Sequence, residues 1–177
     1  MADVISRTGT SEVVALALAV VACMLDVRTR RIPNALTLGG AVGACVYALA
    51  FHGVRGLAMS LAGWAAGLAI FLPFFLLRGL GAGDVKLMAC LGAWLGPGLA
   101  VWSALYAALA GGVLALVVAL ASGYFRRMLE NAYLLLAHFR VAGVRPHPEL
   151  RLDRGKGPRL PYAVPIAVGT VAAMWLH

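Results

Sequence analysis

Acidic side chains are scarce in this chain: seven Asp and Glu residues stand against fifteen Lys and Arg residues in a length of 177. Charged residues of either sign make up 12% of the sequence, whereas hydrophobic residues make up 62%. Soluble domains carry about 25% charged residues and close to half apolar residues. The shortage of charge therefore excludes an ordinary soluble domain and predicts an integral membrane protein.

Cysteine and histidine are also few, and neither forms a motif that binds metal. Cys23, Cys45 and Cys90 lie in apolar stretches without a Cys-x-x-Cys pair, and the four histidines do not form His-Glu-x-x-His. Zinc-site and zinc-protease patterns are thus absent. The Gly-x-Ser-x-Gly run of a serine nucleophile is missing as well. We therefore expect no metal and no other cofactor.

Apolar stretches follow one another along the whole chain, separated by short connections. A transmembrane helix needs roughly 20 apolar residues, so a chain of this length has room for about six. We predict one all-α membrane domain over residues 1–177, a bundle of six transmembrane helices at residues 10–25, 35–51, 56–77, 84–95, 99–121 and 160–176. The spacing of residues 124–140 puts apolar side chains on one face of a helix and charged ones on another, which predicts a cytoplasmic amphipathic helix. A solvated loop is predicted to follow at 141–159.

The basic residues predict how the bundle is oriented. Most of them lie in three connections, at residues 28–31, 78–86 and 126–159. Because cytoplasmic loops collect Lys and Arg, we place these connections in the cytoplasm and both termini outside the inner (plasma) membrane. This orientation accounts for the net charge of +8 without nucleic acid as a partner. We expect the basic loops to contact anionic lipids instead.

Two of the scarce acids border apolar segments at the same predicted face. Asp26 ends the first predicted span and Asp84 opens the fourth, which is too short to cross a bilayer of about 30 Å and so leaves Asp84 within reach of water. Ionisable residues at such positions are usually functional. Two close carboxylates share one proton. One can then activate water while the other donates a hydrogen bond to a carbonyl, as in aspartic peptidases. Which of the two acts as the base stays open.

Other interpretations of the two acids remain. Asp84 could cap the fourth helix, and Asp26 could form a surface ion pair with Arg28 or Arg30. A proton-relay transporter is a second possible function, although the acids lie near one face and no inverted repeat is present.

Gly81 and Gly83 stand beside Asp84 in the run Gly81-Ala82-Gly83-Asp84-Val85-Lys86. Glycine permits positive φ angles and close approach of another backbone. We expect the segment from Arg78 to Asp84 to be mobile and to line a groove for an extended substrate.

This second run, together with Asp26-Val27-Arg28-Thr29-Arg30-Arg31-Ile32-Pro33-Asn34, closely resembles the type IV prepilin peptidases, membrane aspartic peptidases of the Gly-x-Gly-Asp class. The segment Pro161 to Ala167 also resembles the last-helix pattern of that family. The resemblance implies that Asp26 and Asp84 are the catalytic pair. Residues that we assign to substrate binding or structural support are Gly81, Gly83, Lys86, Pro33 and Asn34.

The resemblance also implies a substrate, a prepilin or pseudopilin with an apolar N-terminal helix, whose leader is cut at the cytoplasmic edge of the membrane. Bifunctional members carry an N-terminal region with paired Cys-x-x-Cys motifs and methylate the new N-terminus. This sequence has no such motif, so methyltransferase activity is not implied. The short form is similar to peptidases of tight-adherence (Flp) pilus systems and to archaeal preflagellin peptidases. An inactive scaffold of pilus assembly is a third possible function, and the cleavage position and oligomeric state stay open.

Overall fold

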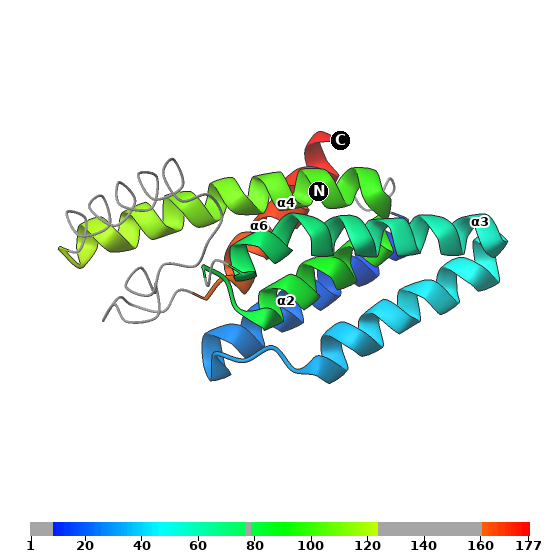
Figure 1. Cartoon of the computed structure of the whole chain (residues 1–177), viewed down its shortest axis with the longest axis horizontal. Helices are drawn as coiled ribbons and strands as arrows, with labels where there is room; N and C mark the ends of the chain where they lie inside the picture. Colours follow the sequence, from blue (N-terminus) through cyan, green and yellow to red (C-terminus); the bar gives the residue numbers. More distant parts are fainter. Residues whose placement is uncertain (1–8, 77–78, 124–160) are drawn as a thin grey trace.

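The computed structural model describes residues 9–76, 79–123 and 161–177, and over these ranges the chain forms helices without a strand (Figure 1). The helices are α2 (Thr10–Thr29), α3 (Asn34–Leu76), α4 (Ala82–Ala121) and α6 (Ala163–Leu176). The first three are long and apolar enough to cross a membrane. The length and composition of these helices agree with the predicted all-α membrane protein.

Single glycines break the two longest helices. Gly53 has φ 64° and ψ −158° inside α3, and Gly96 has φ 77° and ψ 171° inside α4. Residues with a side chain rarely adopt such angles. Figure 1 shows α3 turning back on itself at this break, so that its two arms run side by side. In α4 the second arm starts at Pro97, where a fixed φ suits the first position of a helix.

The prediction of six separate spans is not supported by the described residues, which form four helices. Two of the predicted connections, near residues 51–56 and 95–99, are breaks at a single glycine within α3 and α4, because positive φ redirects the chain without a loop. The last predicted span is only the 14-residue helix α6. The predicted amphipathic helix at 124–140 and loop at 141–159 lie outside the described residues.

Small residues hold the helices together. A β-carbon on Gly63 of α3 would collide with the carbonyl oxygen of Gly92 in α4, and one on Gly92 with that of Gly63. Gly169 of α6 makes an equally close approach to the backbone of Ala107 in α4. Membrane helices commonly associate through such small residues, which allow backbones to touch. Helices α3, α4 and α6 are thus packed at short distances from one another.

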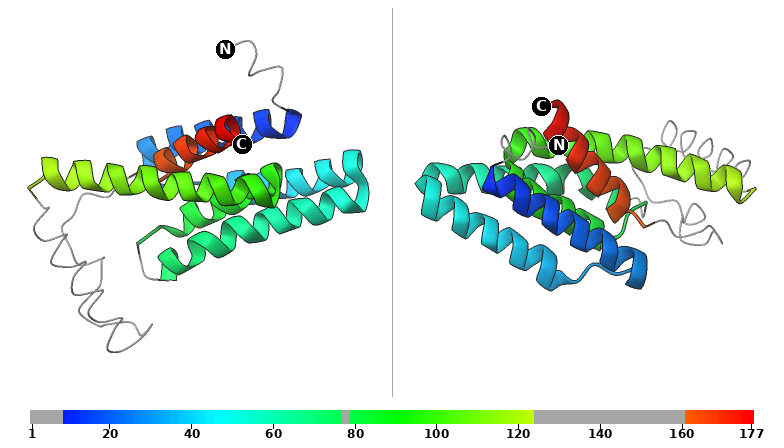
Figure 2. Two further views of the ribbon diagram at one scale, coloured as in Figure 1. Left: turned by 90° about the horizontal axis from the view of Figure 1, so that it is seen from above. Right: turned by 180° about the vertical axis from the view of Figure 1, so that it is seen from behind.

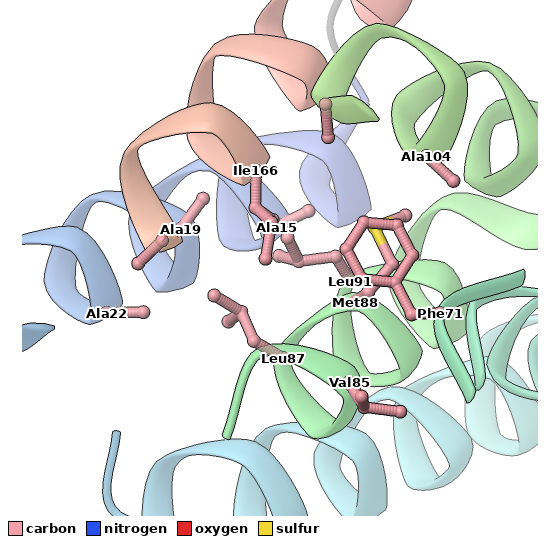
Figure 3. Packing of buried hydrophobic residues seen from close by; sticks show 12 residues of the cluster. Ala15, Ala19, Ala22, Phe71, Val85, Leu87, Met88, Leu91, Ala104 and Ile166 are labelled. Carbon is pink, nitrogen blue, oxygen red and sulfur yellow. The ribbon is translucent and has the colours of Figure 1, made fainter. Parts of the chain in front are cut away.

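The large apolar side chains divide between a small core and the outer surface. Figure 3 shows Leu87, Met88 and Leu91 of α4 packed among alanines of α2 and Ile166 of α6. Many others point outward, among them Val42, Leu109 and Leu120, each more than half exposed. Soluble monomers rarely expose such continuous apolar surface. The outward faces therefore suit contact with lipid.

Candidate active site

Asp26 lies on the inward face of α2. The buried residues of this helix are Ala15, Ala19, Ala22 and Asp26, a spacing of three and four that forms one stripe. Asp26 is 8% exposed and stands in the last turns of the helix, which continues to Thr29. The predicted first span stopped one residue before it, so the helix is longer than expected. The carboxylate therefore faces protein rather than lipid.

The start of α6 contacts this carboxylate. The backbone N–H of Ala163 donates to Oδ2 of Asp26 at 3.3 Å, and the contact is buried. Ala163 is the first residue of α6, where backbone N–H groups lack partners within the helix and the helix dipole is positive. The carboxylate of Asp26 therefore gives one of these N–H groups a hydrogen-bond partner.

Asp84 lies in the first turn of α4 and is partly buried. Its Oδ2 accepts a hydrogen bond from the backbone N–H of Gly81, the N-cap residue, at 3.1 Å. This contact satisfies a backbone donor at the start of the helix. The structural interpretation of Asp84 thus holds in a modified form: the carboxylate supports the helix start, although Gly81 and not Asp84 is the cap.

Two contacts join the segment after Asp26 to the segment around Asp84. Lys86 Nζ donates to Oδ1 of Asn34 at 3.0 Å. A β-carbon on Gly83 would lie 3.3 Å from Cβ of Ile32. The carbonyl of Pro33 accepts from the backbone N–H of Leu36 at 3.1 Å and so starts α3 beside these contacts. The predicted supporting residues are therefore brought together around the acids.

The two acids lie close enough to interact electrostatically. The charge of Asp26 acts on Asp84, and the charge of Asp84 acts on Tyr162. Burial and, second, the charge of Asp84 raise the pKa of the Tyr162 hydroxyl above its ordinary value. The ring of Tyr162 packs on Gly111 of α4, where a β-carbon would lie 2.6 Å from the hydroxyl oxygen. Asp26, Asp84 and Tyr162 thus form a cluster from three different helix ends.

Gly81 and Gly83 do not use the positive φ that glycine permits. Gly81 has φ −77°, and the described glycines with positive φ are Gly53, Gly96 and Gly123. Neither Gly81 nor Gly83 therefore needs a left-handed backbone. Gly83 instead lies close to Ile32, where a β-carbon would be 3.3 Å from Cβ of that side chain. Arg78, at the start of the segment predicted to be mobile, lies outside the described residues.

Sequence reasoning did not assign a site role to Tyr162 or Ala163. Both follow Pro161 in the segment already singled out as a last-helix pattern, which was the available signal. A backbone donor carries no side-chain signature, so the contact of Ala163 with Asp26 emerges only from the fold. Within residues 9–76, 79–123 and 161–177 there is no group of three or more His, Cys, Asp or Glu residues that could hold a metal ion.

Comparison with known families identifies the chain over most of its length. The pattern of the type IV leader peptidase family matches residues 13–116. The chain belongs to this family. The matched region contains both Asp26 and Asp84 and ends before α6, so the helix that contacts Asp26 lies beyond it. No curated protein and no solved structure matches the chain. The resemblance to the prepilin peptidases is thereby confirmed, and this leader peptidase is a hydrolase with helices that suit a membrane.

Proposed function

We propose that this leader peptidase is an aspartic endopeptidase that removes the leader from type IV prepilins, of the Flp-like kind, at the cytoplasmic face of the inner membrane. One observation carries the proposal: Asp26 and Asp84 come from different helices and lie close enough for the charge of one to act on the other. Both fall within the region matched to the family. Two neighbouring carboxylates that share a proton can activate water without a covalent nucleophile.

Both acids accept a backbone hydrogen bond at the start of a helix. Asp26 accepts one from Ala163 at the start of α6, and Asp84 accepts one from Gly81 at the start of α4. In the proposed reaction the ionised carboxylate takes a proton from water as that water attacks the scissile carbonyl. The other carboxyl, still protonated, donates to the carbonyl oxygen and stabilises the tetrahedral intermediate. Because each acid accepts one such hydrogen bond, either carboxyl can serve as the base in the resting state and the other as the proton donor.

The length of the first arm of α4 supports access of water to Asp84. The arm that begins beside Asp84 ends at Gly96, a rise of about 20 Å at 1.5 Å per residue, which is less than the roughly 30 Å of hydrocarbon. Its start must therefore lie in a recess or in thinned bilayer. We propose that both arms of α3 and of α4 cross the membrane with α2 and α6, and that the acids lie at the cytoplasmic ends with both termini outside.

Co-expression with a candidate prepilin tests the proposal. We expect a shift of the prepilin to a smaller size, and at least a hundred-fold slower processing by Asp26→Asn or Asp84→Asn, because each removes half of the shared-proton pair. The double variant should lose no more than either single one. Glu12→Gln is the matched control, since it removes an acid from the opposite end of α2. Processing at the normal rate by either Asp variant contradicts the assignment, and normal pilus assembly by the double variant points to an inactive scaffold.

A further inference from the structure

A second feature of the bundle lies away from the two acids. A cavity of about 400 Å³ opens where the breaks in α3 and α4 meet the start of α2. Its walls come from Ser11 of α2, from both arms of α3 and from the end of the first arm of α4. Figures 1 and 2 show that α2 begins toward the end of the bundle at which α3 turns back and finishes at the other end, where Asp26 lies. The cavity is therefore separated from the candidate active site by the length of α2.

The chemistry of the walls is divided between apolar and cationic. Alanines and Met59 form much of the lining, together with the rings of Tyr47 and Trp94, whose centroids are 5.6 Å apart. Among the lining residues that the structure describes, Arg55 and His52 can carry positive charge, both are exposed, and none is an acid. Such a cavity complements a molecule with an apolar body and an anionic group.

The polar groups of the wall differ in whether they are available to bind a ligand. The indole N–H of Trp94 donates to the carbonyl of Gly40 at 2.9 Å, and the hydroxyl of Ser60 donates to that of Ala93 at 2.8 Å. These donors are already used within the protein. Glu12, next to Ser11, accepts from the backbone N–H of Gly9. Among the described residues no hydrogen bond or ion pair engages Arg55, so its guanidinium is available at the rim.

We infer that this cavity binds a phospholipid with an anionic headgroup. An acyl chain would fill the apolar walls, and the phosphate would lie at the rim against Arg55 and His52. The surroundings favour this occupant, because the cavity opens among outward-facing apolar side chains such as Phe51 and Val54, 71% and 78% exposed. Tyr and Trp side chains also gather at the level of lipid headgroups. A soluble phosphate compound would leave the apolar walls uncovered.

Quenching of Trp94 fluorescence by brominated lipid tests the inference in the full-length chain. Trp64, Trp102 and Trp175 are all exposed and are replaced by Phe, so that Trp94 reports alone. The protein is placed in phosphatidylcholine vesicles containing a small fraction of brominated phosphatidylglycerol or of brominated phosphatidylcholine. We expect half-maximal quenching at an about five-fold lower fraction of the anionic lipid. Equal quenching by the two lipids overturns the proposal.

Two variants separate the cavity from general attraction to a protein of net charge +8. Arg55→Gln should remove the preference for the anionic lipid. Because Arg55 is exposed, the substitution does not place a polar group in the core. Arg28→Gln, the same change in the last turn of α2 at the other end, should leave the preference intact. Equal effects of both variants contradict a specific site.

Two further arms exclude other occupants. Ala48→Leu narrows the cavity and should weaken quenching by the brominated chain; unchanged quenching overturns the proposal. Inorganic phosphate in the buffer should not relieve quenching by the anionic lipid. Relief would indicate that the cavity binds a soluble anion instead of the lipid. The assay contains no prepilin, so its outcome is independent of the proposed peptidase activity.

Discussion

Lys86 and Asn34 connect the two acid-bearing segments through side chains, across 52 positions of the sequence. An exposed polar contact contributes little to stability, about 1 kcal/mol or less. Its effect on the reaction rate is expected to be larger, because it bears on the position of Asp84 relative to Asp26. Misplacement of catalytic groups by about 1 Å can cost a hundred-fold in rate. We therefore regard both residues as positioning residues rather than catalytic ones.

A double-mutant cycle tests this role. We expect Lys86→Ala and Asn34→Ala each to slow prepilin processing by roughly ten-fold, less than loss of either acid. The double variant should be no slower than the single ones, because both remove the same contact. Processing rates in membranes, with the amount of folded enzyme measured in parallel, provide the comparison. Losses that multiply would show that the two residues act separately.

Tyr162 provides a prediction for the alkaline range. Burial and the charge of Asp84 raise its pKa above the ordinary 10, so the folded state holds this proton more tightly than the unfolded state. The corresponding stability is complete below pH 10 and is lost as the pH rises through the folded pKa. We expect Tyr162→Phe to remove this part of the alkaline loss. Between pH 8 and pH 12 the difference between the unfolding midpoints of the two proteins should shift in favour of Tyr162→Phe, and parallel curves would contradict the prediction.

At the scale of residues, the sequence predicted the acids and missed their partners. Asp26 and Asp84 stand out because acids are scarce beside apolar runs. The donors are backbone N–H groups of Gly81 and Ala163, which every residue except proline carries. A pattern of side chains cannot distinguish them, and the contact of Ala163 depends on where α6 docks. The two acids could therefore be singled out from the sequence, whereas their hydrogen-bond donors could not.

At the scale of elements, the glycines of α3 and α4 serve two different purposes. Gly53 and Gly96 redirect the chain through positive φ, whereas Gly63 and Gly92 allow two helices to touch. Hydropathy located the apolar runs but could not distinguish a break inside one helix from a loop between two. The difference lies in the backbone angles of one residue, which composition does not encode. The number of separate helices was therefore the weakest part of the prediction.

Two alanine substitutions separate close packing from helix propensity. Gly63→Ala places a methyl group against the carbonyl of Gly92 and should lower the free energy of unfolding by about 1–3 kcal/mol. Gly112→Ala meets nothing within 4 Å and should be neutral or stabilising by up to about 1 kcal/mol, because alanine favours helix. Reversible unfolding in detergent measures both. Equal effects would show that the contact of α3 with α4 is not limiting.

At the scale of the whole molecule, the two ends of the bundle carry different chemistry. One end holds Asp26, Asp84 and Tyr162, and the other holds the cavity beside Arg55. Their separation follows from helices that run from one end of the bundle to the other. The proposed orientation places the acids at the cytoplasmic face and the cavity at the outer face.

Single cysteines test this orientation. In a background with Cys23, Cys45 and Cys90 replaced by Ala, a cysteine is placed at Val54, near the break in α3, or at Arg31, after α2; both positions are exposed. We expect a membrane-impermeant maleimide to label Val54→Cys in intact cells and Arg31→Cys in inverted vesicles. The cysteine-free parent controls for background. The opposite pattern of labelling would reverse the proposed topology.

The hydrogen bond between Ala163 and Asp26 spans 137 positions, and a ribosome makes the chain in one direction. Both acids, and the glycine contacts of α3 with α4, are synthesised well before α6. Until that helix emerges, Asp26 lacks its backbone donor and Asp84 lacks its neighbour Tyr162. We therefore expect the nascent chain to stay latent during insertion and to acquire its hydrolytic capacity when its last helix docks. Such latency would keep the inserting chain from cleaving neighbouring polypeptides.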